Sequence, residues 1–164
     1  MDRTQGWGGS PTHQGALYYA ADWDNGSGHW AILAANGGTL RCNAEGDSYQ
    51  EGLGNYVAIH NSVAGQTAIH AHLETCGFFM PDSPYAATQG QGIELASDSG
   101  RADGIHLHFH VINGSEYLGP HTTVPFSMSD RDSFTGTGSN GPSDNAGVAY
   151  NDPGSLDANI PATA

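Results

Sequence analysis

The segment GIHLHFHV at residues 104–111 alternates histidine with an apolar residue, and it decides the fold. Side chains of a β-strand point to opposite faces with a period of two, so His106, His108 and His110 share one face of a predicted strand. The apolar residues between them can enter a core on the other face. Neutral imidazole is the commonest metal ligand in proteins, and zinc binds its nitrogen. Three imidazoles on one rigid face therefore indicate a metal or acid/base site rather than a polar face that is merely solvated or hydrogen-bonded.

The rest of the chain repeats this period-two pattern in short segments. The 164 residues include 24 glycines and are 37% hydrophobic, a composition that favours short strands and turns. The pattern predicts strands over residues 16–24, 30–42, 55–60, 66–73 and 92–96, with loops over 1–15, 43–54 and 77–92. Asn36-Gly37 predicts a hairpin within 30–42, and a second hairpin joins 55–60 to 66–73. We expect a mainly antiparallel β domain in residues 1–128 and a Gly/Ser/Asp-rich tail or linker in 129–164.

The charge balance disfavours several classes of partner. The sequence has no Lys, four Arg and 17 acidic residues, which gives a net charge of −13. Phosphate binding needs clustered basic residues, so neither nucleic acid nor an anionic membrane surface is an expected partner. No apolar run reaches the ~20 residues that span a bilayer, and no signal peptide is recognisable. Cys42 and Cys76 form either one disulfide, which would indicate an oxidising compartment, or two buried thiols, and we favour the disulfide.

Two acidic residues at the end of segment 16–24 differ in their surroundings. Asp22 lies between an alanine and a tryptophan, and a buried carboxylate is costly unless it is paired or bound to a metal. Asp24 begins the polar stretch at residues 24–28 and is expected to be a turn residue. Asp22 is therefore the better candidate for a metal ligand.

Several motifs occur in an order that is found in a known family. His13 and Asp22 precede the segments AANGGT (34–39), GNYVAIH (54–60) and TAIHAHL (67–73), and the segments GQGI (90–93) and GIHLHF (104–109) follow. This series resembles the lysostaphin and LytM type of zinc endopeptidase, which cuts peptide bonds in bacterial peptidoglycan. The resemblance covers residues 6–112. It implies a single antiparallel β-sheet domain, a β-sandwich or half-barrel with a long cleft and few or no helices.

The resemblance also implies a role for five side chains. His13, Asp22 and His108 match the zinc ligands of the family. His72 and His106 match catalytic residues beside the metal. The implied cofactor is Zn²⁺, the implied substrate is a peptidoglycan peptide, and the implied location is secreted, periplasmic or at the cell wall. We expect the protein to be a monomer.

Three features depart from the family pattern. Eight residues separate His13 from Asp22, where many members have three. His70 replaces a usual Tyr, and His110 replaces a usual Glu. We expect both histidines to be structural or solvent-facing. Because His70 and His72 are two residues apart, we also expect them to share a strand face.

Two other functions fit part of the pattern. A non-enzymatic relative would use the same domain to bind wall peptide or to regulate a hydrolase. A cupin-like barrel would bind a metal through His106, His108 and Glu116 and would leave His13 and Asp22 without a role. The zinc-peptidase interpretation requires that His13, Asp22 and His108 converge to within about 8 Å of one another.

Overall fold

The computed structural model describes residues 2–9, 12–26, 28–44, 52–76, 84–116, 118 and 122–126. The elements of this part of the chain are β1 (Asp2–Gln5), η1 (a 3-10 helix, Gly15–Leu17), β2 (Ala21–Asp24), β3 (Ala31–Leu33), β4 (Gly38–Asn43), β5 (Asn55–Asn61), β6 (Gln66–Leu73), β7 (Tyr85–Ala87), β8 (Gly92–Leu95), β9 (Leu107–Asn113) and β10 (Thr123–Val124). The predicted tail at 129–164 lies outside the described residues.

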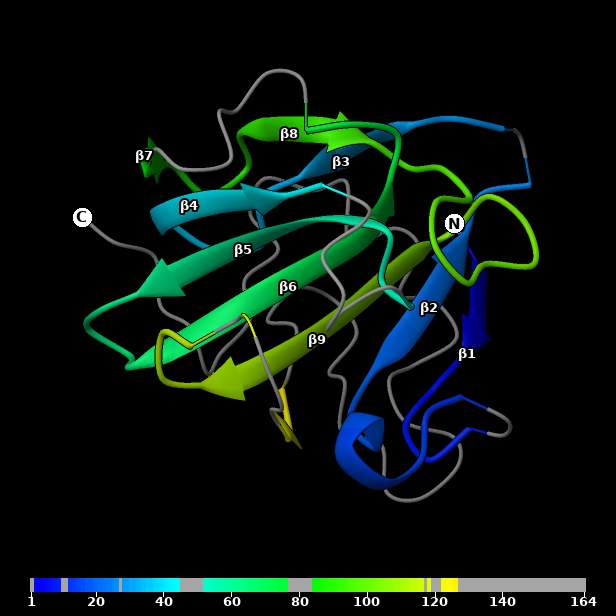
Figure 1. Ribbon diagram of the computed structural model, residues 1–164, viewed down its shortest axis with the longest axis horizontal. Coiled ribbons are helices and arrows are strands. Elements are labelled where there is room, and N and C mark those ends of the chain that lie inside the picture. Colours follow the sequence, from blue (N-terminus) through cyan, green and yellow to red (C-terminus); the bar gives the residue numbers. More distant parts are fainter. Residues whose placement is uncertain are drawn as a thin grey trace.

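The strands form one large and one small antiparallel sheet. The large sheet has the order β1-β2-β9-β6-β5-β4-β7, with β10 paired to β9, and the small sheet pairs β3 with β8. Figure 1 shows β9 and β6 in the middle of the large sheet, between β2 and β5. The fold is therefore mainly β and antiparallel, as predicted, and the one helical element among the described residues is the single turn η1.

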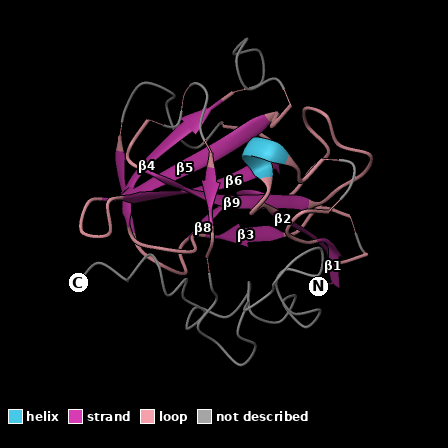
Figure 2. Cartoon of the chain, turned by 90° about the horizontal axis from the view of Figure 1, so that it is seen from below, coloured by secondary structure: helices cyan, strands magenta, loops and turns pink. Residues whose placement is uncertain are grey.

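The main core lies between the large sheet and the small one. Alternate residues of β9, namely Leu107, Phe109 and Val111, are fully buried in a cluster that includes Ile32 of β3 and Ile93 of β8. Figure 2 shows β3 and β8 running beside β9 and β2. Because side chains alternate along a strand, the histidines of β9 are directed to the opposite face of the large sheet.

Several local predictions were wrong. The strands within 30–42 exist, but they do not pair with each other: β3 pairs with β8, and β4 pairs with β5 and β7. Residues 2–5, predicted as loop, form β1 beside β2, and residues 85–87 form β7 within the predicted loop at 77–92. Segment 16–24 is a strand only from Ala21, because η1 precedes it. The hairpin of β5 and β6 is confirmed.

A disulfide joins Cys42 of β4 to Cys76, which follows β6, and this confirms the pairing favoured above. Both cysteines are buried. No helix among the described residues is long and apolar enough to cross a membrane.

Candidate metal centre

The candidate centre is built across strands β2 and β9. Asp22 lies directly opposite His108 in the antiparallel register, so the two side chains point to the same face of the sheet. Their neighbours Trp23 and Phe109 point into the core, where their ring centroids are 6.2 Å apart. The alternation of polar and apolar residues thus brings one carboxylate and one imidazole together on the face opposite the core.

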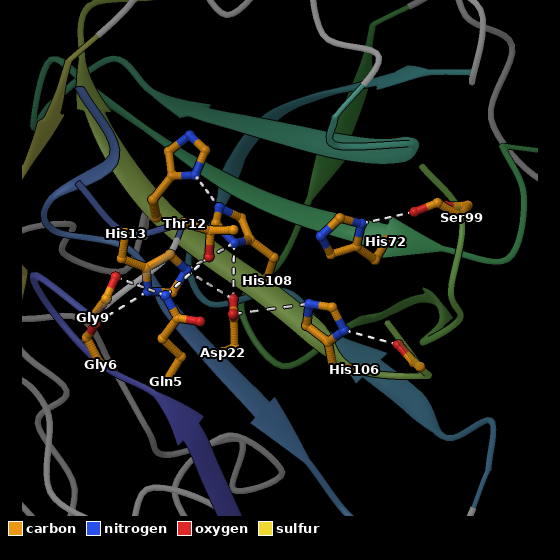
Figure 3. Close-up of polar contacts among 12 residues, drawn as sticks. Gln5, Gly6, Gly9, Thr12, His13, Asp22, His72, Ser99, His106 and His108 are labelled. Carbon is orange, nitrogen blue, oxygen red and sulfur yellow. Dashed lines mark hydrogen bonds and ion pairs between the residues drawn. The ribbon is translucent and has the colours of Figure 1, made fainter. Parts of the chain in front are cut away.

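His13 reaches the same point from the segment between β1 and η1. Gln5 of β1 holds this segment, because its side-chain amide donates to Gly9 O and to Thr12 Oγ1, each at 2.9 Å. The His13 backbone N–H donates to Gly9 O at 2.9 Å, and the His13 side chain is fully buried. Figure 3 shows His13, Asp22 and His108 directed toward one another.

Three potential ligand atoms converge in this cluster. Asp22 Oδ1 lies 2.8 Å from His108 Nδ1 and 3.1 Å from His13 Nε2, and the two nitrogens are 3.3 Å apart. An ion bound tetrahedrally at 2.0–2.1 Å separates its ligand atoms by about 3.3 Å. The cluster therefore has nearly the dimensions of a zinc ligand set, far inside the 8 Å limit, and it could hold a metal ion.

The protonation states suit a cation. Burial alone would raise the pKa of Asp22, but its hydrogen bonds and charge interactions with His108 and His13 outweigh that effect and hold the pKa well below its usual range. Burial lowers the pKa of His108, although the Asp22 carboxylate opposes the shift. Near neutral pH the cluster thus presents an ionised carboxylate beside an imidazole that is held neutral.

Hydrogen bonds to the other ring nitrogens fix which nitrogen faces the cluster. His13 Nδ1 lies 3.1 Å from Gly6 O and donates its proton there, so in the neutral ring the lone pair of Nε2 faces the cluster beside Asp22 Oδ1, where a cation could bind it. His108 has the opposite arrangement, with Nδ1 in the cluster and Nε2 3.0 Å from His110 Nδ1.

His72 enters the site through an unusual backbone conformation. Its φ is 60°, which makes it the one non-glycine residue with positive φ among the described residues. This turn reverses the alternation of β6: His70 contacts Phe109 on the core face, whereas His72 contacts His106 and His108. The expectation that His70 and His72 share a face is therefore wrong. Strain of this kind in a non-glycine residue is found mostly at functional sites.

The ring of His72 is oriented by the loop between β8 and β9. His72 Nδ1 donates to Ser99 O at 2.8 Å, which leaves Nε2 as an acceptor. Burial, followed by the neighbouring His108 and His106, lowers the pKa of His72 to about 3. The loop is held close by two glycines, since a Cβ on Gly54 would lie 2.4 Å from Ser99 backbone carbon and one on Gly100 would lie 2.3 Å from Gly54 N.

His106 lies beside His72, with ring centroids 4.5 Å apart. Its Nδ1 donates to Gly104 O at 2.9 Å, and its Nε2 lies 3.9 Å from Asp22 Oδ2. Unlike His72, the His106 side chain is 18% exposed. A cavity of about 450 Å³ opens beside these side chains; its lining includes Asp22, His72, His106, His108, Leu53 and Arg101.

Other sequence candidates lie outside this cluster. Asp24 accepts a hydrogen bond from Gly26 N at 2.8 Å and is a turn residue, as predicted. The cupin-like alternative required Glu116 as a metal ligand and left His13 and Asp22 without a role. Glu116 is exposed, whereas His13 and Asp22 belong to the three-residue cluster with His108, so that alternative loses its basis. His70 and His110 are both fully buried, so neither is solvent-facing.

Sequence reasoning missed the groups that orient the imidazoles. They are the carbonyl groups of Gly6, Ser99 and Gly104 and the side chain of His110. A backbone carbonyl leaves no residue-type signal, so three of these four could not have been found. Arg101, which lines the cavity and lies three residues before Gly104, was also missed.

Comparison with known proteins supports the fold. No protein-family model and no curated protein matches the chain. Among solved structures, a mutant catalytic domain of the prophage-encoded M23 protein EnpA from Enterococcus faecalis is 24% identical, with a TM-score of 0.53 over 74% of this chain and 86% of that one. The catalytic domain of the antimicrobial peptidase lysostaphin from Staphylococcus simulans is 19% identical, with a TM-score of 0.52 over 69% of this chain and 80% of that one.

A third similar structure is LytU, which is 19% identical, with a TM-score of 0.51 over 70% of this chain and 74% of that one. The chain has the lysostaphin/LytM-type fold. The resemblance seen in the sequence is therefore confirmed at the level of the fold. In this lysostaphin/LytM-type domain, the cluster of His13, Asp22 and His108 could hold a metal ion.

Proposed function

We propose that the chain is a zinc-dependent endopeptidase that hydrolyses peptide bonds in the stem peptides or cross-bridges of bacterial peptidoglycan. It would act as a monomer in a secreted, periplasmic or cell-wall location. His13, Asp22 and His108 are the proposed zinc ligands, and His72 and His106 are the proposed catalytic residues.

The observation that carries the proposal is the convergence of the three buried ligand atoms beside two further histidines. Placing a carboxylate oxygen and two imidazole nitrogens within 4.8 Å of one another in a buried position is costly unless a cation or proton binds between them. A set of three protein ligands, of which Asp22 and His108 line the cavity, is typical of a catalytic zinc site, whereas structural sites use four protein ligands. The fold of known peptidases and the sequence motifs support the same activity.

When bound, zinc would polarise the scissile carbonyl and lower the pKa of its water ligand toward neutrality. The ligands contribute one negative charge, from Asp22, and two neutral imidazoles, so the centre would keep one positive charge. A peptide bound in the cavity would lie beside Asp22 and His108, and Arg101 on the wall, which also carries Asp103, would be suited to bind a carboxylate of that peptide.

The surroundings of His72 and His106 suggest different roles for the two residues. Amide hydrolysis needs a base that accepts a proton from water and a donor that stabilises the developing oxyanion. His72 is buried and donates Nδ1–H to Ser99 O, so its neutral ring offers the lone pair of Nε2 to the attacking water. His106 is partly exposed and lies 3.9 Å from Asp22 Oδ2, so its protonated form would be paired with a carboxylate. We therefore assign the acceptor role to His72 and the donor role to His106.

Purified peptidoglycans of different cross-link type, incubated with the protein with and without a chelator, would test the proposal. We expect the suspensions to lose turbidity, new amino and carboxyl termini to appear by mass spectrometry, and both effects to stop when zinc is removed. His72→Ala and His106→Ala should each lower kcat by about 10²–10⁴-fold, whereas His60→Gln, which changes a histidine hydrogen-bonded to Thr67, should leave activity unchanged.

A protein that binds one zinc per chain but cleaves none of the peptidoglycans would contradict the proposal and support the wall-binding alternative. A protein that binds no zinc and cleaves nothing would contradict both the metal centre and the activity.

A further inference from the structure

His110 contacts the proposed ligand His108 on the side away from the ligand cluster. The distance between His108 Nε2 and His110 Nδ1 is 3.0 Å, and the ring planes are inclined at 75°. The two residues are 4% and 0% exposed, respectively, so water does not compete freely for this contact. The sequence places His110 two residues after His108 on β9, which brings it to the same face of the strand.

The direction of this hydrogen bond follows from the position of the cluster. His108 Nδ1 faces Asp22 Oδ1 and His13 Nε2 at 2.8 and 3.3 Å. If that nitrogen gives its lone pair to a cation, a neutral imidazole must carry its proton on Nε2. His108 Nε2–H then donates to His110 Nδ1, which must be unprotonated.

We propose that His110 is a positioning residue for the metal centre: as a neutral acceptor it holds His108 in the Nε2–H tautomer and fixes its ring plane, so that Nδ1 is presented to the cation. This inference rests on the proposed zinc site. Metal-bound histidines commonly donate their second N–H to a carboxylate, a carbonyl or water. A neutral imidazole in that place adds no negative charge, so Asp22 remains the one anion among these contacting groups.

Zinc affinity, measured by competition with a chromophoric chelator, tests the proposal without reference to catalysis. His110→Phe keeps a ring of similar size but removes the acceptor, and we expect it to weaken zinc binding by about 10–100-fold. His110→Asn places an amide oxygen near the position of Nδ1, and we expect it to restore the affinity to within about threefold of the unsubstituted protein, since an acceptor is again available.

His70 offers a matched control. It is also a fully buried histidine and contacts Phe109, but on the core face of the sheet. His70→Phe should therefore leave zinc affinity unchanged, whatever it does to stability. A folded His110→Phe protein that binds zinc as tightly as the unsubstituted protein would overturn the proposal, as would equal losses in the His70→Phe and His110→Phe proteins.

Nitrogen-15 NMR of the zinc-loaded, unsubstituted protein keeps the proposal testable if His110→Phe does not fold. We expect the ring proton of His108 on Nε2 and a coupling across the hydrogen bond to His110 Nδ1. A His108 proton on Nδ1, or the absence of that coupling, would overturn it. If the unsubstituted protein binds no zinc, both this proposal and the metal centre fail; if it binds zinc but hydrolyses nothing, only the proposed activity fails.

Discussion

The left-handed backbone at His72 leads to a prediction in which glycine stabilises a β-strand. His72 has a φ of 60° and lies within β6, next to Ala71, which is outside the left-handed region. His72→Ala and His72→Gly both remove the imidazole, its hydrogen bond to Ser99 O and its ring contacts with His106. The difference between the two variants therefore isolates the effect of the backbone conformation.

The magnitude follows from two opposing contributions. An L-residue in the left-handed region costs roughly 1–2 kcal/mol relative to its preferred conformations, and glycine avoids that cost. Glycine loses more conformational freedom on folding, which costs about 0.5–1 kcal/mol relative to alanine. We therefore expect the His72→Gly protein to be more stable than the His72→Ala protein by roughly 0.75 kcal/mol, the difference between the midpoints of the two ranges, which corresponds to about 1.5–3 °C in Tm for a domain of this size.

The assay is equilibrium unfolding in denaturant with a chelator present, so that metal binding does not contribute. Ala71→Gly provides the control, because at a position with ordinary φ the same change should destabilise by about 0.5–1 kcal/mol. The reasoning is refuted if His72→Ala is as stable as His72→Gly, or more stable, while Ala71→Gly behaves as expected.

Four further predictions follow from other features of the structure. Asp22→Asn removes the one anion of the cluster, so zinc should no longer raise the Tm measured by calorimetry; an undiminished rise would contradict the ligand assignment. Burial lowers the pKa of His70 to about 3, so the folded protein takes up fewer protons than the unfolded chain between about pH 6.5 and 3. The unfolding free energy should fall as pH falls through that window. His70→Gln should reduce the slope of unfolding free energy against pH, measured without metal, by about 1.4 kcal/mol per pH unit. Reduction of the Cys42–Cys76 disulfide, which closes a loop of 34 residues, should lower the unfolding free energy by about 2–4 kcal/mol. A denaturation midpoint that does not change on reduction would contradict this prediction. Arg101→Gln should raise KM for substrates with a free carboxylate near the scissile bond more than for amidated ones, with kcat little changed; equal effects on both substrates would exclude this role.

Local periodicity predicted those parts of the fold that depend on neighbouring residues. The alternation at 104–111 became β9 from Leu107 onward, with His106 just before the strand, and the turn after Asn61 produced the hairpin of β5 and β6. Predictions failed where pairing is between distant segments. Asn36-Gly37 resembled a hairpin turn, yet the apolar residues of β3 find their partners in β8, about 60 residues later, because both strands cover the core.

The convergence of His13, Asp22 and His108 could be predicted because Asp22 and His108 differ chemically from their surroundings. Asp22 is a carboxylate in an apolar frame, and His108 lies in the middle of the histidine strand, so both were recognisable in the sequence. His72 was identified through its motif, but its change of face was not, since a positive φ at histidine depends on the loop that carries Ser99. The long separation of His13 and Asp22 is explained by η1, which lies between them.

Which ring nitrogen a histidine presents to the site depends on the hydrogen-bond partner of its other ring nitrogen. Carbonyl groups of Gly6 and Ser99 hold the protons of His13 and His72 on Nδ1, so each presents Nε2 to the site. His108 presents Nδ1 instead, because its Nε2 has a side-chain acceptor in His110. An imidazole moved to a neighbouring position of β9 would point to the opposite face of the sheet and would lose these partners. The loops that supply these carbonyls are therefore as necessary to the proposed site as the strand.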